Sequence, residues 1–68
     1  MFFGVMQMIS VSSSAIRAIG FDGYHLGVVF RGRGRRYDHP GVPESVFIAF
    51  LSAPSKGRFY RRYIRGRY

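Results

Sequence analysis

The middle of the chain alternates between hydrophobic and polar residues in two stretches, which predicts β-strands near residues 18–22 and 24–31. Asp22-Gly23 separates the two stretches, and this dipeptide favours a two-residue turn between antiparallel strands. The turn fixes the pairing and places Phe21 opposite Tyr24. With this register, the bulky side chains of both strands fall on one face of the predicted sheet.

A third strand is predicted near residues 35–39, after a glycine-rich loop, and it ends before Pro40 because proline cannot donate a hydrogen bond to a sheet. Pairing Arg31 with Arg36 across this loop keeps the bulky residues on the same face. It also sets two like charges opposite each other, which an anion between them would relieve. The predicted packed face consists of Ile19, Phe21, Tyr24, Leu26, Val28, Phe30 and Tyr37.

Two short helices are predicted after the strands, near residues 43–53 and 56–65. Pro43 suits the first position of the first helix, and Pro54 ends it. Ser55 is a suitable N-terminal cap for the second helix. We therefore predict an α+β fold, in which a three-stranded antiparallel β-meander is followed by two short helices packed on one face.

The N-terminal boundary is predicted from turn-forming residues. Residues 1–9 are expected to form a flexible tail that is too short to span a membrane, and residues 10–68 a single domain. Extending the first strand back along the chain would place Arg17 on the packed face, so we expect the strand to start or to bulge near Ala18.

The last predicted helix has a hydrophobic face and a basic face. Phe59 and Tyr63 lie on the hydrophobic face and are expected to dock the helix onto the sheet. The basic face fits an anion-binding surface and equally a solvated helix, and both interpretations stay open. The candidate nucleic-acid-binding residues are Lys56, Arg58, Arg61, Arg62, Arg65 and Arg67 in this segment and Arg31, Arg33 and Arg36 in the second hairpin.

The net charge of +8 comes from ten arginines and one lysine against three acidic residues. Guanidinium groups form bidentate hydrogen bonds to phosphate and stack on bases, which makes nucleic acid the leading candidate partner. An acidic protein or an anionic membrane surface would also be attracted by this charge. The glycines between the arginines of residues 31–36 are typical of RNA-binding segments, but a hairpin loop requires them equally.

Few residues could support catalysis or bind a metal. The chain has no cysteine, which is typical of a reducing, cytoplasmic setting. His25 and His39 fall on opposite faces of the predicted sheet, and their spacing from the acidic residues matches no metal motif. We expect His39 to be partly buried and hydrogen-bonded within the sheet. The sequence therefore predicts a non-enzyme without metal or cofactor.

Four segments together resemble the KTSC domain family, whose members also occur at the C-terminus of some lysyl-tRNA synthetases. These segments are VSSSAIRAIGFD (11–22), RYDH (36–39), GVPESV (41–46) and SKGRFYRRYIRGRY (55–68). The resemblance implies a central Tyr-x-Tyr motif, and RNA binding has been suggested for the family. Tyr37 matches the first tyrosine of that motif, His39 stands in place of the second, and Arg61 stands where the family has an amide.

From charge and resemblance together, the sequence predicts a non-catalytic RNA-binding domain that acts through arginine–phosphate contacts. The alternative is a protein-interaction or homo-oligomerising module. For that alternative, the candidate surface is the open face of the sheet, with the small residues Ala18, Gly20, Gly27 and Val29.

Overall fold

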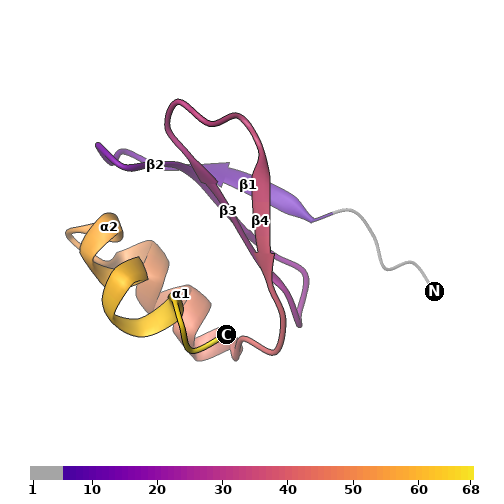
Figure 1. The fold of residues 1–68 in the computed structure, drawn as a ribbon. Helices are drawn as coiled ribbons and strands as arrows, with labels where there is room; N and C mark the ends of the chain where they lie inside the picture. Colours follow the sequence, from indigo (N-terminus) through magenta and orange to yellow (C-terminus); the bar gives the residue numbers. More distant parts are fainter. Residues whose placement is uncertain (1–5) are drawn as a thin grey trace.

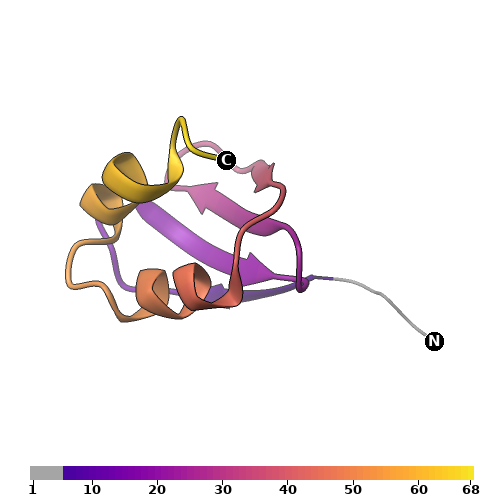
Figure 2. The same ribbon diagram turned by 90° about the horizontal axis from the view of Figure 1, so that it is seen from below.

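The computed structural model describes residues 6–68 and shows a four-stranded antiparallel sheet with helices on one face (Figure 1). Strands that follow one another in the chain are neighbours in the sheet, in the order β1-β2-β3-β4. The view from below in Figure 2 shows the helices in front of the sheet. The predicted α+β class and the helices on one face are confirmed. The elements are β1 Gln7–Ser10, β2 Ile16–Phe21, β3 Leu26–Phe30, β4 Arg36–His39, α1 Glu44–Ser52 and α2 Lys56–Phe59, and α2 continues into the π-helical turn η1 Tyr60–Ile64.

The prediction of three strands was wrong, because β1 adds a fourth at the edge of the sheet. Gln7 pairs with Phe21, and Ser10 pairs with Ala18. Met6, just before β1, is only 7% exposed. Residues 6–9 therefore belong to the folded domain, whereas residues 1–5 of the predicted tail lie outside the described part of the chain. The segment was missed because it shows no alternation of hydrophobic and polar residues.

Both predicted hairpin registers were wrong by two residues. Phe21 pairs with Leu26 and not with Tyr24, because Asp22 to His25 form a wider turn in which the Asp22 N–H donates to the His25 carbonyl at 3.2 Å. Tyr24 consequently lies in the turn and is 57% exposed, not packed. In the second hairpin, Val28 pairs with Tyr37. A shift of two residues leaves every remaining side chain on its predicted face.

The expected irregularity near Ala18 is confirmed, since the pairing of β2 with β3 shifts between Ile16 and Ala18. This bulge lets Ile16 reach the core, where it is fully buried, while Arg17 stays exposed. The Ser13 hydroxyl holds the loop before β2 by accepting from the backbone N–H groups of Ala15 and Ile16, both at 3.2 Å. Ser13 thus has the turn-forming role expected of this serine-rich segment.

The core lies between the sheet and the helices. At its centre the Phe50 ring of α1 is fully buried and stacks on Phe59 of α2, with ring centroids 5.3 Å apart. Ser55 caps α2 as predicted, since its hydroxyl accepts from the Arg58 N–H at 3.4 Å. The expectation that Tyr63 docks the terminal helix was wrong, because Tyr63 is 47% exposed. The buried core cluster consists of Ile16, Ile19, Leu26, Val28, Val42, Phe50, Tyr60 and Ile64.

The wider last turn explains which side chains of the terminal helix point inward. In η1 the Arg65 N–H donates to the Tyr60 carbonyl at 2.9 Å, a bond that spans five residues and not four. Turns of this kind hold an extra residue and are frequent at functional sites. Tyr60 and Ile64 are both buried, so the arginines between and after them face outward. Among residues 6–68, no helix is both long and apolar enough to cross a bilayer.

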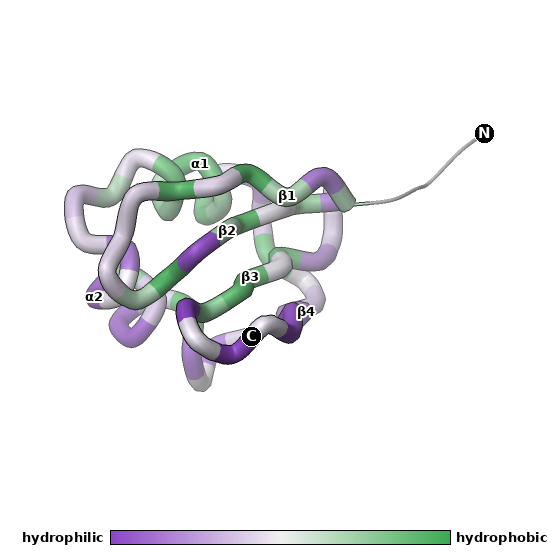
Figure 3. Tube along the Cα trace, turned by 90° about the horizontal axis from the view of Figure 1, so that it is seen from above, coloured by the Kyte–Doolittle hydropathy of each residue, from purple (hydrophilic) through white to green (hydrophobic). Residues whose placement is uncertain are grey.

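Polarity is distributed unevenly over the sheet. Figure 3 shows hydrophobic residues along the central strands β2 and β3, and hydrophilic residues along β4 and the turn that precedes it. The hydrophilic edge faces the C-terminal segment, which is also rich in arginine. The two basic segments of the sequence therefore lie at the same side of the molecule.

Candidate functional site

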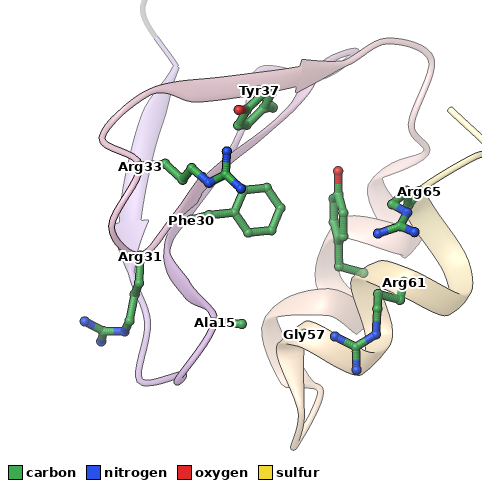
Figure 4. A pocket seen from close by; sticks show the side chains of 9 residues that line it. Ala15, Phe30, Arg31, Arg33, Tyr37, Gly57, Arg61 and Arg65 are labelled. Carbon is green, nitrogen blue, oxygen red and sulfur yellow. The ribbon is translucent and has the colours of Figure 1, made fainter.

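A hollow with a cavity volume of about 470 Å³ lies between the sheet and the C-terminal helix (Figure 4). The sheet contributes β3, β4 and the turn between them, and the helix contributes α2, η1 and the residue after η1. We call this feature the aromatic hollow. Its lining residues are Ala15, Phe30, Arg31, Arg33, Tyr37, Gly57, Tyr60, Arg61 and Arg65.

Three aromatic rings form the wall of the aromatic hollow. Phe30 lies edge-to-face with Tyr37, at a centroid distance of 5.7 Å, and edge-to-face with Tyr60, at 5.0 Å. Edge-to-face pairs at such distances attract each other beyond the area they bury, which holds the rings in place. The wall therefore offers ring faces and edges that are fixed at steep angles to one another, 64° between Phe30 and Tyr37 and 82° between Phe30 and Tyr60.

Tyr60 connects this wall to β4. Its hydroxyl lies 2.9 Å from Nε2 of His39, so His39 is hydrogen-bonded to the terminal helix and not within the sheet as predicted. Burial raises the pKa of Tyr60, and the positive charge of Arg65 opposes this only in part. The phenol is thus neutral near pH 7. His25 lies in the first hairpin turn, where its Nδ1 is 3.0 Å from a carboxylate oxygen of Asp22.

Four arginines line the aromatic hollow. Figure 4 shows the guanidinium of Arg33 beside the Phe30 ring, with Arg61 and Arg65 on the helix across from it. None of the lining residues is acidic, so the hollow holds uncompensated positive charge. Arg31 lines the rim, but Figure 4 shows that its guanidinium points away from the hollow.

A second hollow, which we call the polar hollow, has a volume of about 300 Å³ and adjoins the first. Ala15, Gly57 and Arg61 line both. The polar hollow offers hydroxyl groups and cations, which are donors that suit an anion. Its further lining residues are Ser12, Ser13, Ser14, Pro54, Ser55, Lys56 and Arg58.

Gly57 lets the terminal helix approach the loop before β2. A Cβ atom on Gly57 would lie 3.2 Å from the Cβ of Ala15, which is tighter than ordinary van der Waals contact. Glycine in the first turn of a helix costs about 1 kcal/mol relative to alanine. The close approach explains this residue, because it brings the two hollows together along the same loop.

The structure gathers some of the predicted site residues and separates others. Arg33, Arg61 and Arg65 meet at the aromatic hollow, while Lys56 and Arg58 line the polar hollow. Three predicted site residues are exposed but line neither hollow: Arg36, Arg62 and Arg67.

The predicted pairing of Arg31 with Arg36 is wrong. Arg36 pairs with Val29, and its guanidinium binds Asp38 through two hydrogen bonds of 2.7 and 3.1 Å. Arg31 instead bonds to the loop before β2, where its Nε donates to the Ser13 carbonyl. The repulsion on which that part of the prediction rested is therefore absent, because the turn between β3 and β4 is longer than expected.

Sequence analysis did not identify Phe30 and Tyr60 as members of the site, and it singled out Tyr37 only through the family resemblance. Phe30 and Tyr37 were assigned to the packed face, and hydrophobic periodicity does not show that a packed face remains partly open at one end. The serines of the polar hollow were interpreted only as turn residues and, in the case of Ser55, as a helix cap. One feature of the sequence could have pointed to these serines: they lie in segments that resemble the KTSC family, as does the basic C-terminal segment.

Comparison with known proteins identifies the fold. The family model described as KTSC domain matches residues 12–68. The chain belongs to the KTSC domain family. The crystal structure of a KTSC domain protein from Yersinia pestis is similar, with a TM-score of 0.85 and 45% sequence identity over 93% of this chain and 90% of that chain. No curated protein matches the chain at a significant level.

The two residues at the central motif of this KTSC domain both lie on the helix-facing side of β4. Tyr37 contributes its ring to the aromatic hollow, and Arg35 lies over the same ring at 5.1 Å from its centroid. His39 bonds to Tyr60 behind the wall. In this KTSC domain the motif therefore builds and supports the aromatic hollow.

Proposed function

We propose that this KTSC domain is a non-catalytic, cytoplasmic module that binds RNA through arginine–phosphate contacts. The observation that carries the proposal is that Arg33 and the helix residues Arg61 and Arg65 border one hollow without an acidic neighbour in its lining. Guanidinium groups in such an arrangement can form charge-assisted, bidentate hydrogen bonds to phosphate oxygens. Their positive charge would also draw an anionic chain from solution.

Two features favour RNA over an acidic protein. The aromatic rings beside the arginines suit a ligand that carries flat groups next to phosphates, whereas carboxylate side chains offer only the charge. The hydroxyl groups of the polar hollow add neutral donors, which commonly contact phosphate oxygens. One RNA strand can reach the aromatic rings and the hydroxyl groups together, because Arg61 borders both hollows.

The proposal is tested by fluorescence anisotropy with a labelled single-stranded RNA across a series of salt concentrations. We expect the logarithm of the binding constant to fall linearly with the logarithm of the salt concentration, by about 0.7 per phosphate contacted. Replacing Arg61 and Arg65 by glutamine should reduce this slope by about 1.4. Both side chains are exposed, so the fold should be retained.

The matched control replaces Arg62 and Arg67, which are equally exposed but line neither hollow. This pair removes the same charge, and we expect it to change the slope less. An acidic polypeptide serves as competitor. Equal effects of the two pairs, or preferential binding of the polypeptide, would contradict RNA binding at this surface.

The surface named for the alternative protein-interaction module is largely covered. Gly20 and Gly27 are buried beneath Met6 and Met8, and Ala18 is only 9% exposed. No observation on the described residues favours self-association through that face. A mass by light scattering at two concentrations tests it, since a homo-oligomer would lose mass on dilution.

A further inference from the structure

We infer that the aromatic hollow receives one unpaired base of an RNA strand, while Arg61 and the polar hollow hold the phosphates next to it. The inference rests on the proposed function and assigns a different part of the ligand to each hollow. It predicts which form of RNA the domain selects.

The first argument is the chemistry of the aromatic hollow. Its wall consists of the rings of Phe30, Tyr37 and Tyr60, held edge-to-face. Arg33 reaches in beside Phe30 and supplies a planar cation that can stack on a base (Figure 4). Aromatic rings and guanidinium planes are the groups on which unpaired bases stack in RNA-binding proteins.

The second argument is size and placement. A volume of about 470 Å³ lies in the range of sites that accept small flat ligands. The hollow lies between two layers of the fold, the sheet and the terminal helix, so a ligand must enter between them (Figure 4). A base stacked and paired inside a double helix cannot do so, whereas an unpaired base can be turned out of its strand.

The third argument is the continuity of the two hollows. Arg61 borders both hollows, and so do Ala15 and Gly57. A base in the aromatic hollow therefore has its own backbone beside Arg61. From there the strand continues over the polar hollow, where Lys56 and Arg58 can meet the next phosphate.

The test uses the full chain and four RNA probes of known composition in anisotropy measurements. The first is a short single strand of uridines, and the second is a strand of equal length in which every position lacks a base. The third is a blunt RNA duplex, and the fourth is free uridine monophosphate as competitor. The first two carry the same phosphates, so their affinities differ only through the bases.

We expect the uridine strand to bind about tenfold more tightly than the abasic strand, with the same dependence on salt. The duplex should bind more weakly than the uridine strand despite its higher charge density. Uridine monophosphate should displace the strand only at concentrations far above those of the strand itself, because it lacks the second phosphate contact.

Two protein variants separate stacking from stability. Tyr37→Leu keeps apolar bulk in the aromatic hollow but removes the ring, and we expect it to reduce the tenfold preference to about twofold without changing the affinity for the abasic strand. Tyr63→Leu is the control, because Tyr63 is exposed and does not line the hollow. Thermal unfolding of both variants shows whether the fold is intact. If Tyr37→Leu unfolds the protein, the affinity for the abasic strand is lost as well. Tyr37→Phe is then measured instead, and because it keeps the ring we expect it to keep the preference for the uridine strand over the abasic strand.

The outcomes distinguish the inference from the function on which it rests. If the parent protein binds none of the strands, RNA binding itself is wrong. If it binds the uridine and abasic strands equally, or the duplex more tightly, it binds RNA but the aromatic hollow takes no base. If uridine monophosphate displaces the strand at comparable concentration, the site is one for free nucleotides and the assignment of the polar hollow is wrong.

Discussion

Arginines on the two faces of the sheet differ in whether a carboxylate lies beside them. On the face away from the helices, Arg36 is bound to Asp38 through two hydrogen bonds, and Met6 and Met8 fill the space over the glycines of β2 and β3. On the helix-facing side, Arg33 and the arginines of the terminal helix border a hollow that has no acidic lining residue. Net charge alone would rank all these arginines together. The absence of a carboxylate neighbour, beside an open aromatic surface, is what marks one group as a candidate binding site.

The largest expected effect lies on the helix-facing side, in the packing that supports the hollow. Phe50 is fully buried and stacks on Phe59, which holds the two helices together. Phe50→Ala should leave a cavity and lower the free energy of unfolding by about 3–5 kcal/mol. In a domain of this size such a loss can abolish folding. Urea denaturation measures it, and a loss below about 1 kcal/mol would mean that the helices do not depend on this contact.

A smaller effect is expected from filling the opposite face. A Cβ atom on Gly20 would lie 2.5 Å from the Met8 sulfur and 2.7 Å from the Gln7 carbonyl oxygen, so β1 must move. Gly20→Ala should cost about 1–3 kcal/mol. Gly27→Ala is the matched control and should cost less, because its Cβ meets mainly the flexible Met6 side chain. The reverse order in thermal unfolding would show that β1 is not held against β2 as described.

The comparison of arginines on the two faces predicts a difference in RNA affinity. Arg33→Gln should weaken RNA binding about tenfold, because it removes a charge-assisted hydrogen bond and a stacking plane. Arg36→Gln removes the same charge from the other face, where Asp38 already binds it, and should change affinity by less than about twofold. Anisotropy at one salt concentration suffices. Equal losses would show that total charge, and not position, controls binding.

The smallest effect concerns the first hairpin turn, far from the aromatic hollow. The Asp22 carboxylate accepts from the backbone N–H groups of His25 and Tyr24, at 2.6 and 2.9 Å, and these bonds lower its pKa from 3.8 to about 2. Because the pKa is depressed in the folded state, the stabilisation is present above pH about 4 and is lost as the pH falls through about 2. The difference in melting temperature between the parent and Asp22→Ala should therefore shrink between about pH 5 and pH 2. A constant difference would mean that the charge is not involved.

Much of the fold was predictable because the alternation of hydrophobic and polar residues shows which face of the sheet a side chain lies on. It does not show which residue of the neighbouring strand pairs with it. Both hairpin registers were wrong by two residues, yet Phe21 and Val28 still fell on the packed face. The cap of α2 was also predictable, since Ser55 acts locally, whereas Pro43 lies just before α1 and not at its first position. β1 was not predictable, because its pairing depends on Gly20 leaving room for Met8, and this is a contact between distant residues.

The candidate site was predictable in its charge but not in its shape. The basic face of the terminal helix follows from spacing along one helix, so Arg61 and Arg65 were identified. Their meeting with Arg33 depends on how closely α2 approaches the loop before β2, which Gly57 and Ala15 determine. The π-helical turn is a further tertiary feature, and helical periodicity did not show that Tyr63 lies outside while Tyr60 and Ile64 are buried.

The sequential order of the strands has a consequence for the rate of folding. Each strand pairs with the one before it in the chain, so the sheet can grow hairpin by hairpin with short loops to close. Contacts between nearby residues are associated with fast folding, and we expect the meander to form early. The terminal helix is the exception, because Tyr60 and Ile64 pack in the same core as Ile16, which is far away in the sequence. The last event in folding should therefore be the docking of this helix, and that same event closes the aromatic hollow.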